Sequence, residues 1–317
     1  MFSMRLRRSA TIAAGKKITP FSLFRGLRRC YAFFSGSARP SSQFPRHGCD
    51  RTHRCASSPT TTHTQREVIF QNDITYAKVG DIDFKLDLCR PAQGKGPFPA
   101  LIFFGGGGWT ELSRMDYYPE IGQAARRGYV AVTADYRLTS VKEKGTTKYP
   151  FPAQLYDAKC AVRWLRANAA KYKIDSDHIG AIGFSAGAQL ALMLGLTKPS
   201  DGLEGECGNA GYSSSVQAVV NQSGPTDLIA YFRETFPNFY AVDLLGGTPE
   251  QVPEQYKRAS PLTYIRSDSP PILTIHGDSD LDVRPKHTQL LDAKNEGCWS
   301  LPHSHTHERR DARMRSI

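Results

Sequence analysis

Two stretches near residue 70 alternate apolar with polar residues, and a third stretch is apolar throughout. Residues 69–77 and 82–88 alternate, which is typical of half-buried antiparallel strands. Residues 100–104, Ala-Leu-Ile-Phe-Phe, form an uninterrupted apolar run, which is typical of a parallel strand buried on both faces. The pattern therefore predicts two antiparallel edge strands that precede a buried sheet.

Beyond residue 104, apolar runs alternate with amphipathic stretches of helical period. Residues 153–173 place six apolar side chains on one helical face, with charges opposite: Leu155, Ala158, Val162, Leu165, Ala169 and Tyr172. The same patterns predict strands at 129–134, 179–182, 218–221 and 272–275, helices at 115–127, 189–194 and 285–296, and an irregular Pro- and Phe-rich insertion at 225–260. Strands that alternate with helices indicate an α/β fold with a mostly parallel sheet and helices on both faces.

The formal net charge of +11 is confined to the first 65 residues, which contain twelve of the 41 basic and one of the 30 acidic residues. Residues 66–317 carry no net charge, which argues against nucleic-acid binding by this part. We divide the chain into a basic leader (1–65), a domain (66–297) and an irregular tail (298–317). The leader resembles an organellar transit peptide; a disordered basic arm and an extension absent from the mature protein are the alternatives.

Neither the apolar runs nor the cysteines indicate a membrane span, a zinc site or a disulfide framework. No apolar run approaches the ~20 residues needed to cross a bilayer. Seven cysteines, an odd number, occur singly and without C-x-x-C spacing, at Cys30, Cys49, Cys55, Cys89, Cys160, Cys207 and Cys298. Scattered cysteines of this kind predict no metal site and no set of disulfides.

The segment Gly183–Gly187 has the sequence Gly-Phe-Ser-Ala-Gly and stands between a predicted strand and a predicted helix. In this context G-x-S-x-G indicates a nucleophile elbow, a tight turn that projects the serine, with glycines that let strand and helix approach closely. The amide of Ala186 then lies at a helix N-terminus, where an oxyanion is stabilised. Ser185 is therefore the predicted nucleophile.

A second glycine-rich stretch, Gly105–Gly108, follows the buried strand and precedes Trp109. It lacks both the Gly-Lys-Ser/Thr ending of a nucleotide-binding loop and G-x-G-x-x-G spacing. Together with a downstream elbow, its bare amides indicate the second half of an oxyanion hole, in which each donor contributes ~2.7–4 kcal/mol of transition-state stabilisation. A flexible glycine-rich turn without a binding role is the alternative.

Three acidic residues alternate after the predicted strand 272–275: Asp278, Asp280 and Asp282. A carboxylate beyond a strand end can orient a histidine base, and in hydrolases with an elbow it follows the serine in the chain. We assign this role to Asp280, with the other two acids as competitors and a solvated loop or weak cation site as the alternative. His276 is predicted to be a hydrogen-bonded turn residue rather than a base.

Seven ordered blocks between about residues 80 and 297 resemble the α/β-hydrolase esterases, in particular the hormone-sensitive-lipase-like and feruloyl/acetyl-xylan-esterase-like (BD-FAE-like) groups. The blocks are 105–109, 135–138, 151–166, 183–187, 224–228, 260–262 and 270–280. The resemblance implies a single α/β-hydrolase domain with Ser185 as the nucleophile and Asp280 as the acid. It also implies that the amides of Gly107, Gly108 and Ala186 are the oxyanion donors.

By the same resemblance, Tyr136, Arg137 and Asp157 are structural rather than catalytic. The glycine loop departs from the family pattern, because Gly105 stands where His-Gly-Gly-Gly-Trp has its histidine. A looser oxyanion loop is then expected. Alternatively the loop carries one extra glycine and Phe104 takes the place of the histidine, which leaves open which amides serve.

The C-terminal end departs further from the family. After the acid, such enzymes have a helix, a last apolar strand and a Gly-His step, whereas here the predicted helix 285–296 leads into a charged tail. The last strand and helix are thus predicted to be missing or degenerate. His305 is the predicted base, with His303 and His307 as alternatives. A chain without a catalytic histidine and a His-x-His-x-His metal site in an extended segment are also compatible with the sequence.

The predicted function is hydrolysis of a carboxylic ester, on a small molecule or a carbohydrate, through an acyl-serine intermediate and without a cofactor or metal. A binding protein that keeps the fold without the base is one alternative. A prolyl-oligopeptidase-type peptidase is another, although residues 1–80 are too short for its propeller. Aromatic residues of the insertion are predicted either to line an acyl or aryl pocket or to close the domain: Tyr231, Phe232, Phe236, Phe239 and Tyr240. The particular ester and the oligomeric state are not indicated.

Overall fold

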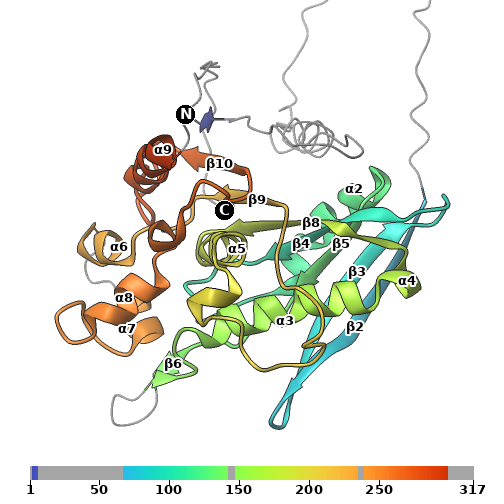
Figure 1. Ribbon diagram of the computed structural model, residues 1–317, viewed down its shortest axis with the longest axis horizontal. Coiled ribbons are helices and arrows are strands. Elements are labelled where there is room, and N and C mark those ends of the chain that lie inside the picture. The colour runs from blue at the N-terminus through green and yellow to red at the C-terminus, as the bar shows by residue number, and fades with distance from the viewer. Residues whose placement is uncertain (1, 6–66, 142–146, 235–238, 299–317) are drawn as a thin grey trace, which may run out of the picture. The chain divides into compact units, whose positions relative to one another are not determined.

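The computed structural model describes residues 2–5, 67–141, 147–234 and 239–298 (Figure 1). The proposed leader and tail lie outside the described residues, apart from residues 2–5 and Cys298. An eight-stranded sheet has the order β1-β10-β9-β8-β4-β5-β3-β2. Among the described helices, none has the length and apolar character that a bilayer crossing requires.

Five neighbouring strands of this sheet run parallel to one another. They are β4 (Phe98–Phe104), β5 (Val130–Ala134), β8 (Ile174–Phe184), β9 (Ala218–Gln222) and β10 (Ile272–Gly277). Every residue of β5 is buried, as are most of β4 and β9, which agrees with the mainly apolar sequences of these strands. The predicted parallel sheet is confirmed.

Antiparallel strands occupy both edges of the sheet. On one side β3 (Ile82–Pro91) pairs with β5, and β2 (Val68–Val79) pairs with β3 across two register shifts. The two predicted antiparallel strands are confirmed, but only β2 is an edge strand, because β3 lies between β2 and β5 and its residues 86–89 are all buried. On the other side β1 (Phe2–Arg5) pairs antiparallel with β10. A separate hairpin of two short strands, β6 (Ser140–Val141) and β7 (Thr147–Lys148), lies outside the sheet.

Helices follow the strands in the predicted order. The first predicted helix consists of the short turn η1 (Arg114–Tyr117) and α2 (Tyr118–Arg126), which packs on β3 and β5. The second breaks at Asn168 into α3 (Ala153–Ala167) and α4 (Ala169–Tyr172). The elbow helix α5 (Ala186–Leu196) packs on α3, β8 and β9 and is buried almost throughout, as expected for a helix that is apolar on all sides apart from Gln189.

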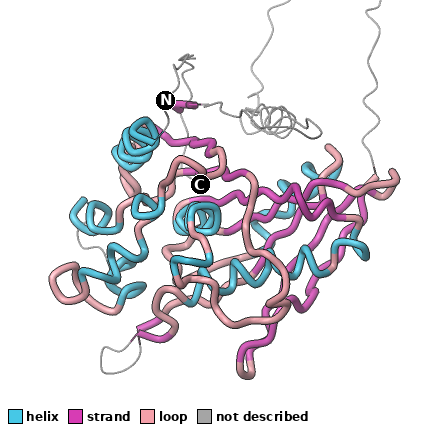
Figure 2. Tube along the Cα trace, viewed as in Figure 1, coloured by secondary structure: helices cyan, strands magenta, loops and turns pink. Residues whose placement is uncertain are grey.

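The insertion at 225–260 is not irregular, so this prediction was wrong. It forms α6 (Leu228–Glu234), α7 (Phe239–Leu245) and α8 (Pro253–Ala259), which Figure 2 shows as a group of short helices. Each spans only seven residues, too few for an apolar stripe to recur as a helical pattern. Local signals nonetheless mark where two of them begin. The Asp227 Oδ1 atom accepts hydrogen bonds from two amides at the start of α6, and a proline opens α8.

Two short turns and one further helix are the remaining described elements. Two 3-10 turns, η2 (Pro199–Asp201) and η3 (Pro261–Tyr264), follow α5 and α8. The last described helix, α9 (Lys286–Cys298), confirms the predicted helix after the acidic turn.

Candidate active site

The glycine loop and the elbow lie side by side at one edge of the sheet. They follow β4 and β8, which are parallel neighbours with Phe104 opposite Gly183, so their carboxyl ends meet at the same edge. Gly187 packs directly on the end of β4, because a Cβ atom there would lie 2.1 Å from the Phe104 carbonyl oxygen. Only glycine permits this approach.

Ser185 occupies a strained turn between β8 and α5. Its backbone has φ 52° and ψ −119°, a conformation that non-glycine residues rarely adopt. The Ser185 amide donates to the Gln222 carbonyl on β9 (2.9 Å), which ties the turn to the sheet. A Cβ atom on Gly183 would lie 2.1 Å from the Gly187 oxygen. The predicted strand–turn–helix geometry around Ser185 is confirmed.

The glycine loop presents unused amides beside this serine. Gly107 and Gly108 have φ of +110° and +58°, and an ideal Cβ on Gly106 would lie 3.4 Å from the Ser185 Cβ atom. The Gly107 carbonyl is engaged in a turn with the amides of Thr110 and Glu111 (3.0 and 3.1 Å). Within the described residues, the amides of Gly107, Gly108 and Ala186 make no hydrogen bond.

Buried polar contacts fix the shape of the loop even though it lacks the family's histidine. The Trp109 indole donates to the Gln189 side chain of α5 (3.2 Å), and Gln189 in turn donates to the Ala259 carbonyl (2.8 Å). The Tyr136 hydroxyl donates to the Gly105 carbonyl (2.9 Å). The side chain of Leu112 fills the space into which a Cβ on Gly105 would project, at 2.2 Å. These contacts, which the sequence did not reveal, hold the loop against the elbow helix.

The acidic turn after β10 holds the carboxylate of Asp280 in place. The Asp280 Oδ1 atom accepts from the amides of Asp282 and Val283 (3.1 and 3.0 Å). The side chains of Asp278 and Asp282 are exposed. His276 is buried and hydrogen-bonded through both ring nitrogens, to the Thr288 hydroxyl and the Val283 carbonyl (2.7 Å each). It is the hydrogen-bonded residue that was predicted.

The other described histidines, His178 and His287, also have polar partners. His178 pairs with Asp175, and buried His287 contacts Thr226. Burial, partly offset by the Glu234 carboxylate, lowers the pKa of His287 to about 4, so it is neutral at pH 7. None of the three described histidines is hydrogen-bonded to Ser185. The predicted base His305, with His303 and His307, lies outside the described residues.

Tyr231 on α6 packs against the end of the glycine loop. Its buried ring meets Trp109 edge-on, with centroids 6.2 Å apart. Burial, followed by the nearby carboxylate of Asp282, by Tyr240 and by Asp280, raises the pKa of Tyr231 to about 12. The Tyr231 ring therefore packs on Trp109 of the glycine loop, and the charge of the candidate acid Asp280 acts on its hydroxyl.

Some aromatic residues of the insertion are packed in the domain, and others are exposed. Tyr231 is buried, and the partly buried Phe232 packs edge-on against Tyr256 (5.9 Å between centroids). Phe239 and Tyr240 are largely exposed, whereas Phe236 lies outside the described residues. The insertion thus both closes the domain and leaves aromatic surface available.

The glycine loop, the elbow and the acidic turn lie within a stretch that matches a known protein family. The BD-FAE family model matches residues 86–294, more than half of the chain. The chain belongs to the BD-FAE family. This domain contains the glycine loop, the elbow and the acidic turn, and the predicted α/β-hydrolase fold is confirmed by solved structures of similar proteins.

Several relatives of this BD-FAE chain are named esterases. Esterase LipC of Mycobacterium tuberculosis is 32% identical over 188 residues, which cover 58% of this chain and 45% of LipC. A truncated carbohydrate esterase from gut microbiota is 27% identical with a TM-score of 0.63, covering 74% of this chain and 86% of that one. Thermogutta terrifontis esterase 2, phosphoramylated by tabun, is 29% identical with a TM-score of 0.59, and the match covers 74% of this chain and 80% of that one. The chain spans about half the length of the curated relatives it matches.

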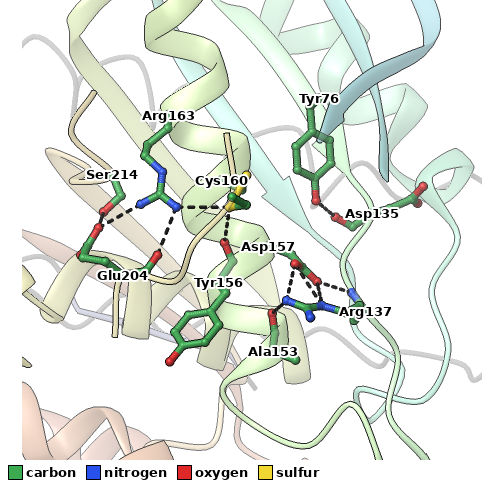
Figure 3. Close-up of a disulfide and its surroundings, with 11 residues drawn as sticks. Tyr76, Asp135, Arg137, Ala153, Tyr156, Asp157, Cys160, Arg163, Glu204 and Ser214 are labelled. Carbon is green, nitrogen blue, oxygen red and sulfur yellow. Dashed lines mark hydrogen bonds and ion pairs between the residues drawn. A yellow bond between two sulfur atoms is a disulfide. The ribbon is translucent and has the colours of Figure 1, made fainter. Parts of the chain in front are cut away.

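One prediction about cysteines was wrong, because Cys160 and Cys207 form a disulfide (Figure 3). It joins α3 to the loop after η2 across 47 residues. Cysteine spacing could not reveal the pair, since the two residues meet only when the loop folds back over the helix. The described Cys89 is free and buried.

Buried charges surround this disulfide. Lys159, fully buried, and Arg163 both pair with Glu204, and the Ser214 hydroxyl donates to the same carboxylate (2.7 Å). Burial lowers the pKa of Lys159, an effect that Glu204 opposes. In the same view, Figure 3 shows a second ion pair nearer the start of α3.

This second pair joins Arg137 to Asp157, with the guanidinium and the backbone amide of Arg137 bound to the carboxylate at 2.8–3.2 Å. The pair links the loop after β5 to α3, in agreement with a structural role. A cavity of about 550 Å³ opens between these two ion pairs, with Arg137, Tyr156, Glu204 and Cys207 in its wall. Ser185 and the glycine loop do not line it.

Proposed function

We propose that this BD-FAE domain hydrolyses carboxylic esters, with Ser185 as the nucleophile. The observation that carries the proposal is the strained Ser185 backbone at the head of α5, next to loop amides that have no hydrogen bond within the described residues. A tight turn of this kind exposes a serine hydroxyl, and preorganised amides stabilise the negative charge that develops on a carbonyl oxygen. The esterase names of the relatives agree with this chemistry.

In the proposed reaction, the Ser185 oxygen forms a bond to the ester carbonyl carbon while its proton passes to the base. The carbonyl electron pair moves onto oxygen, which the amides of Gly107, Gly108 and Ala186 bind. When the carbonyl re-forms, the bond to the alcohol oxygen breaks and the alcohol takes the proton from the base. Water then repeats the sequence on the acyl-serine, releasing the carboxylic acid and restoring the hydroxyl.

We assign the role of the base to His305 and its orientation to Asp280. Asp280 is supported over its neighbours by the two amides that fix its carboxylate and by the exposure of Asp278 and Asp282. The ester substrate is a small molecule or a carbohydrate-linked ester, for which the carbohydrate esterase similarity is the support. No cofactor takes part in these steps.

The test is hydrolysis of p-nitrophenyl acetate and butyrate by the full chain beside two variants. Ser185→Ala and His305→Ala should each lower kcat/KM by at least about 10³-fold, because a triad member is removed while the oxyanion amides remain. Matched controls are Ser279→Ala, an exposed serine, and His178→Ala, a histidine paired with Asp175. If the unmutated chain hydrolyses the two esters no faster than Ser185→Ala does, the proposal is contradicted. If His305→Ala leaves kcat/KM unchanged, only the assignment of His305 as the base is wrong.

A further inference from the structure

Two half-exposed aromatic rings stand against the glycine loop. Tyr240, at the start of α7, has 48% of its surface exposed, and Phe184, within the elbow, has 49%. Large apolar side chains are normally covered, so exposed rings that cluster beside a site are informative. Phe239, the neighbour of Tyr240, is 65% exposed and serves as a comparison.

The Tyr240 ring lies directly on the loop backbone. An ideal Cβ atom on Gly108 would lie 2.2 Å from Tyr240 Cδ1 and 2.4 Å from Cε1, so the ring contacts the bare Cα of this glycine. The Phe184 ring lies against Gly106, where an ideal Cβ would be 3.0 Å from Cδ1. The two rings therefore contact the loop at residues 106 and 108, close to the nucleophile.

The position of the Tyr240 ring matters for an ester bound at this loop. The carbonyl oxygen of such an ester binds at the loop amides, so its substituents lie within a few bond lengths of Gly108. The acyl group remains attached to Ser185 beside the loop through both chemical steps, whereas the alcohol departs after the first. A ring that rests on the loop is thus well placed to limit the acyl chain.

We propose that Tyr240 is a specificity-determining residue that restricts the length of the acyl group. This inference rests on the proposed ester hydrolysis, since it assigns the wall of the same site. The ligand class is an ester with a short acyl group, and removal of the ring admits longer chains. A single methylene in an apolar pocket changes discrimination by roughly 10-fold or more, so the effect is measurable.

The test uses equilibrium binding, which does not depend on turnover. The ligands are 4-nitrobenzyl methyl, propyl and heptyl ketones, in which CH₂ replaces the ester oxygen of p-nitrophenyl acetate, butyrate and octanoate. Their dissociation constants are measured by calorimetry in the full chain carrying Ser185→Ala, which prevents covalent addition. Tyr240→Ala should improve binding of the heptyl ketone relative to the methyl ketone by at least about tenfold, and Tyr240→Phe should leave the ratio unchanged.

Two further variants keep the test decisive. Tyr240→Trp enlarges the ring and should shift the ratio in the opposite direction, and Phe239→Ala removes the neighbouring exposed ring and should not change it. A ratio within twofold of the parent in Tyr240→Ala, an equal shift in Phe239→Ala, or no binding of any ketone would overturn the inference. If the ketone ratios shift as expected while the unmutated chain shows no Ser185-dependent hydrolysis, the proposed function fails and the assignment of Tyr240 to a binding wall stands.

Discussion

Two regions of this domain are built by opposite means. At the elbow and the glycine loop, close backbone contact is possible because side chains are absent, as at Gly183 and Gly187. Around α3, contact is made by side chains, through the Cys160–Cys207 disulfide and the buried charges of Lys159 and Glu204. The first arrangement leaves amides available for a ligand, whereas the second pairs its buried charges with one another. We therefore expect substitutions at the elbow and the glycine loop to affect ester hydrolysis, and substitutions around α3 to affect mainly the free energy of unfolding.

The largest stability effect should come from removing the disulfide. The bond closes a loop of 47 residues, for which the chain-entropy estimate is about 4 kcal/mol. Cys160→Ala combined with Cys207→Ala should lower the free energy of unfolding by about this amount. Urea denaturation followed by circular dichroism measures it, and ester hydrolysis by the same variant should remain within about twofold because the disulfide lies outside the proposed site.

The matched control is Cys89→Ala, since Cys89 is buried and free. It should cost on the order of 1 kcal/mol, the loss from a small buried side chain. If the double variant were no less stable than this control, the disulfide would not stabilise the α3 region. If it abolished hydrolysis while remaining folded, the separation of the two regions would be wrong.

Gly183→Ala tests the region built on backbone contact. The added Cβ would lie 2.1 Å from the Gly187 oxygen, which is backbone and cannot rotate away. We expect a loss of about 3 kcal/mol in the free energy of unfolding, as for overpacking of a buried site, together with loss of hydrolysis. Gly208→Ala is the control, because no atom lies within 4 Å of its added Cβ. Equal stability of the two variants would show that the elbow accommodates the methyl group.

Glu204→Gln tests the charged region and should have the smallest of these effects. It leaves the buried Lys159 without its carboxylate, which should cost about 2 kcal/mol because Glu204 itself is partly exposed and screened. Adding Lys159→Met removes the unpaired charge and should recover most of the loss. A double variant less stable than Glu204→Gln would mean that the lysine contributes by packing rather than by charge.

The same variant has a defined pH dependence. Burial raises the pKa of Glu204, but hydrogen bonds from Lys159 and Ser214 outweigh burial and leave the pKa lowered. The carboxylate therefore stabilises the fold above its unfolded pKa, and this contribution is lost as pH falls through the folded pKa. The stability difference between the unmutated chain and Glu204→Gln should begin to shrink as the pH falls below the unfolded carboxyl pKa of about 4.3 and should disappear once the pH lies below the lowered folded pKa. A difference that persists in acid would exclude the ion pair as its cause.

Most of the fold could be predicted from local patterns. The antiparallel strands, the parallel strands and the elbow turn each have a period or a glycine arrangement that acts over neighbouring residues, and these were confirmed; the interior position of β3 was not predicted. The helices of 225–260 were missed because two-turn helices do not repeat an apolar face. Their starts at Asp227 and Pro253 were the available signals.

The sequence by itself determined the order of strands and helices and the placement of Ser185 in a strand–turn–helix segment, because these depend on residues close along the chain. Only the tertiary structure decided which distant groups meet. It brought Gln189 to Trp109, Tyr240 to Gly108 and Cys160 to Cys207. The reason is physical: such contacts depend on how a loop returns across the sheet, and no periodicity of the sequence encodes that path.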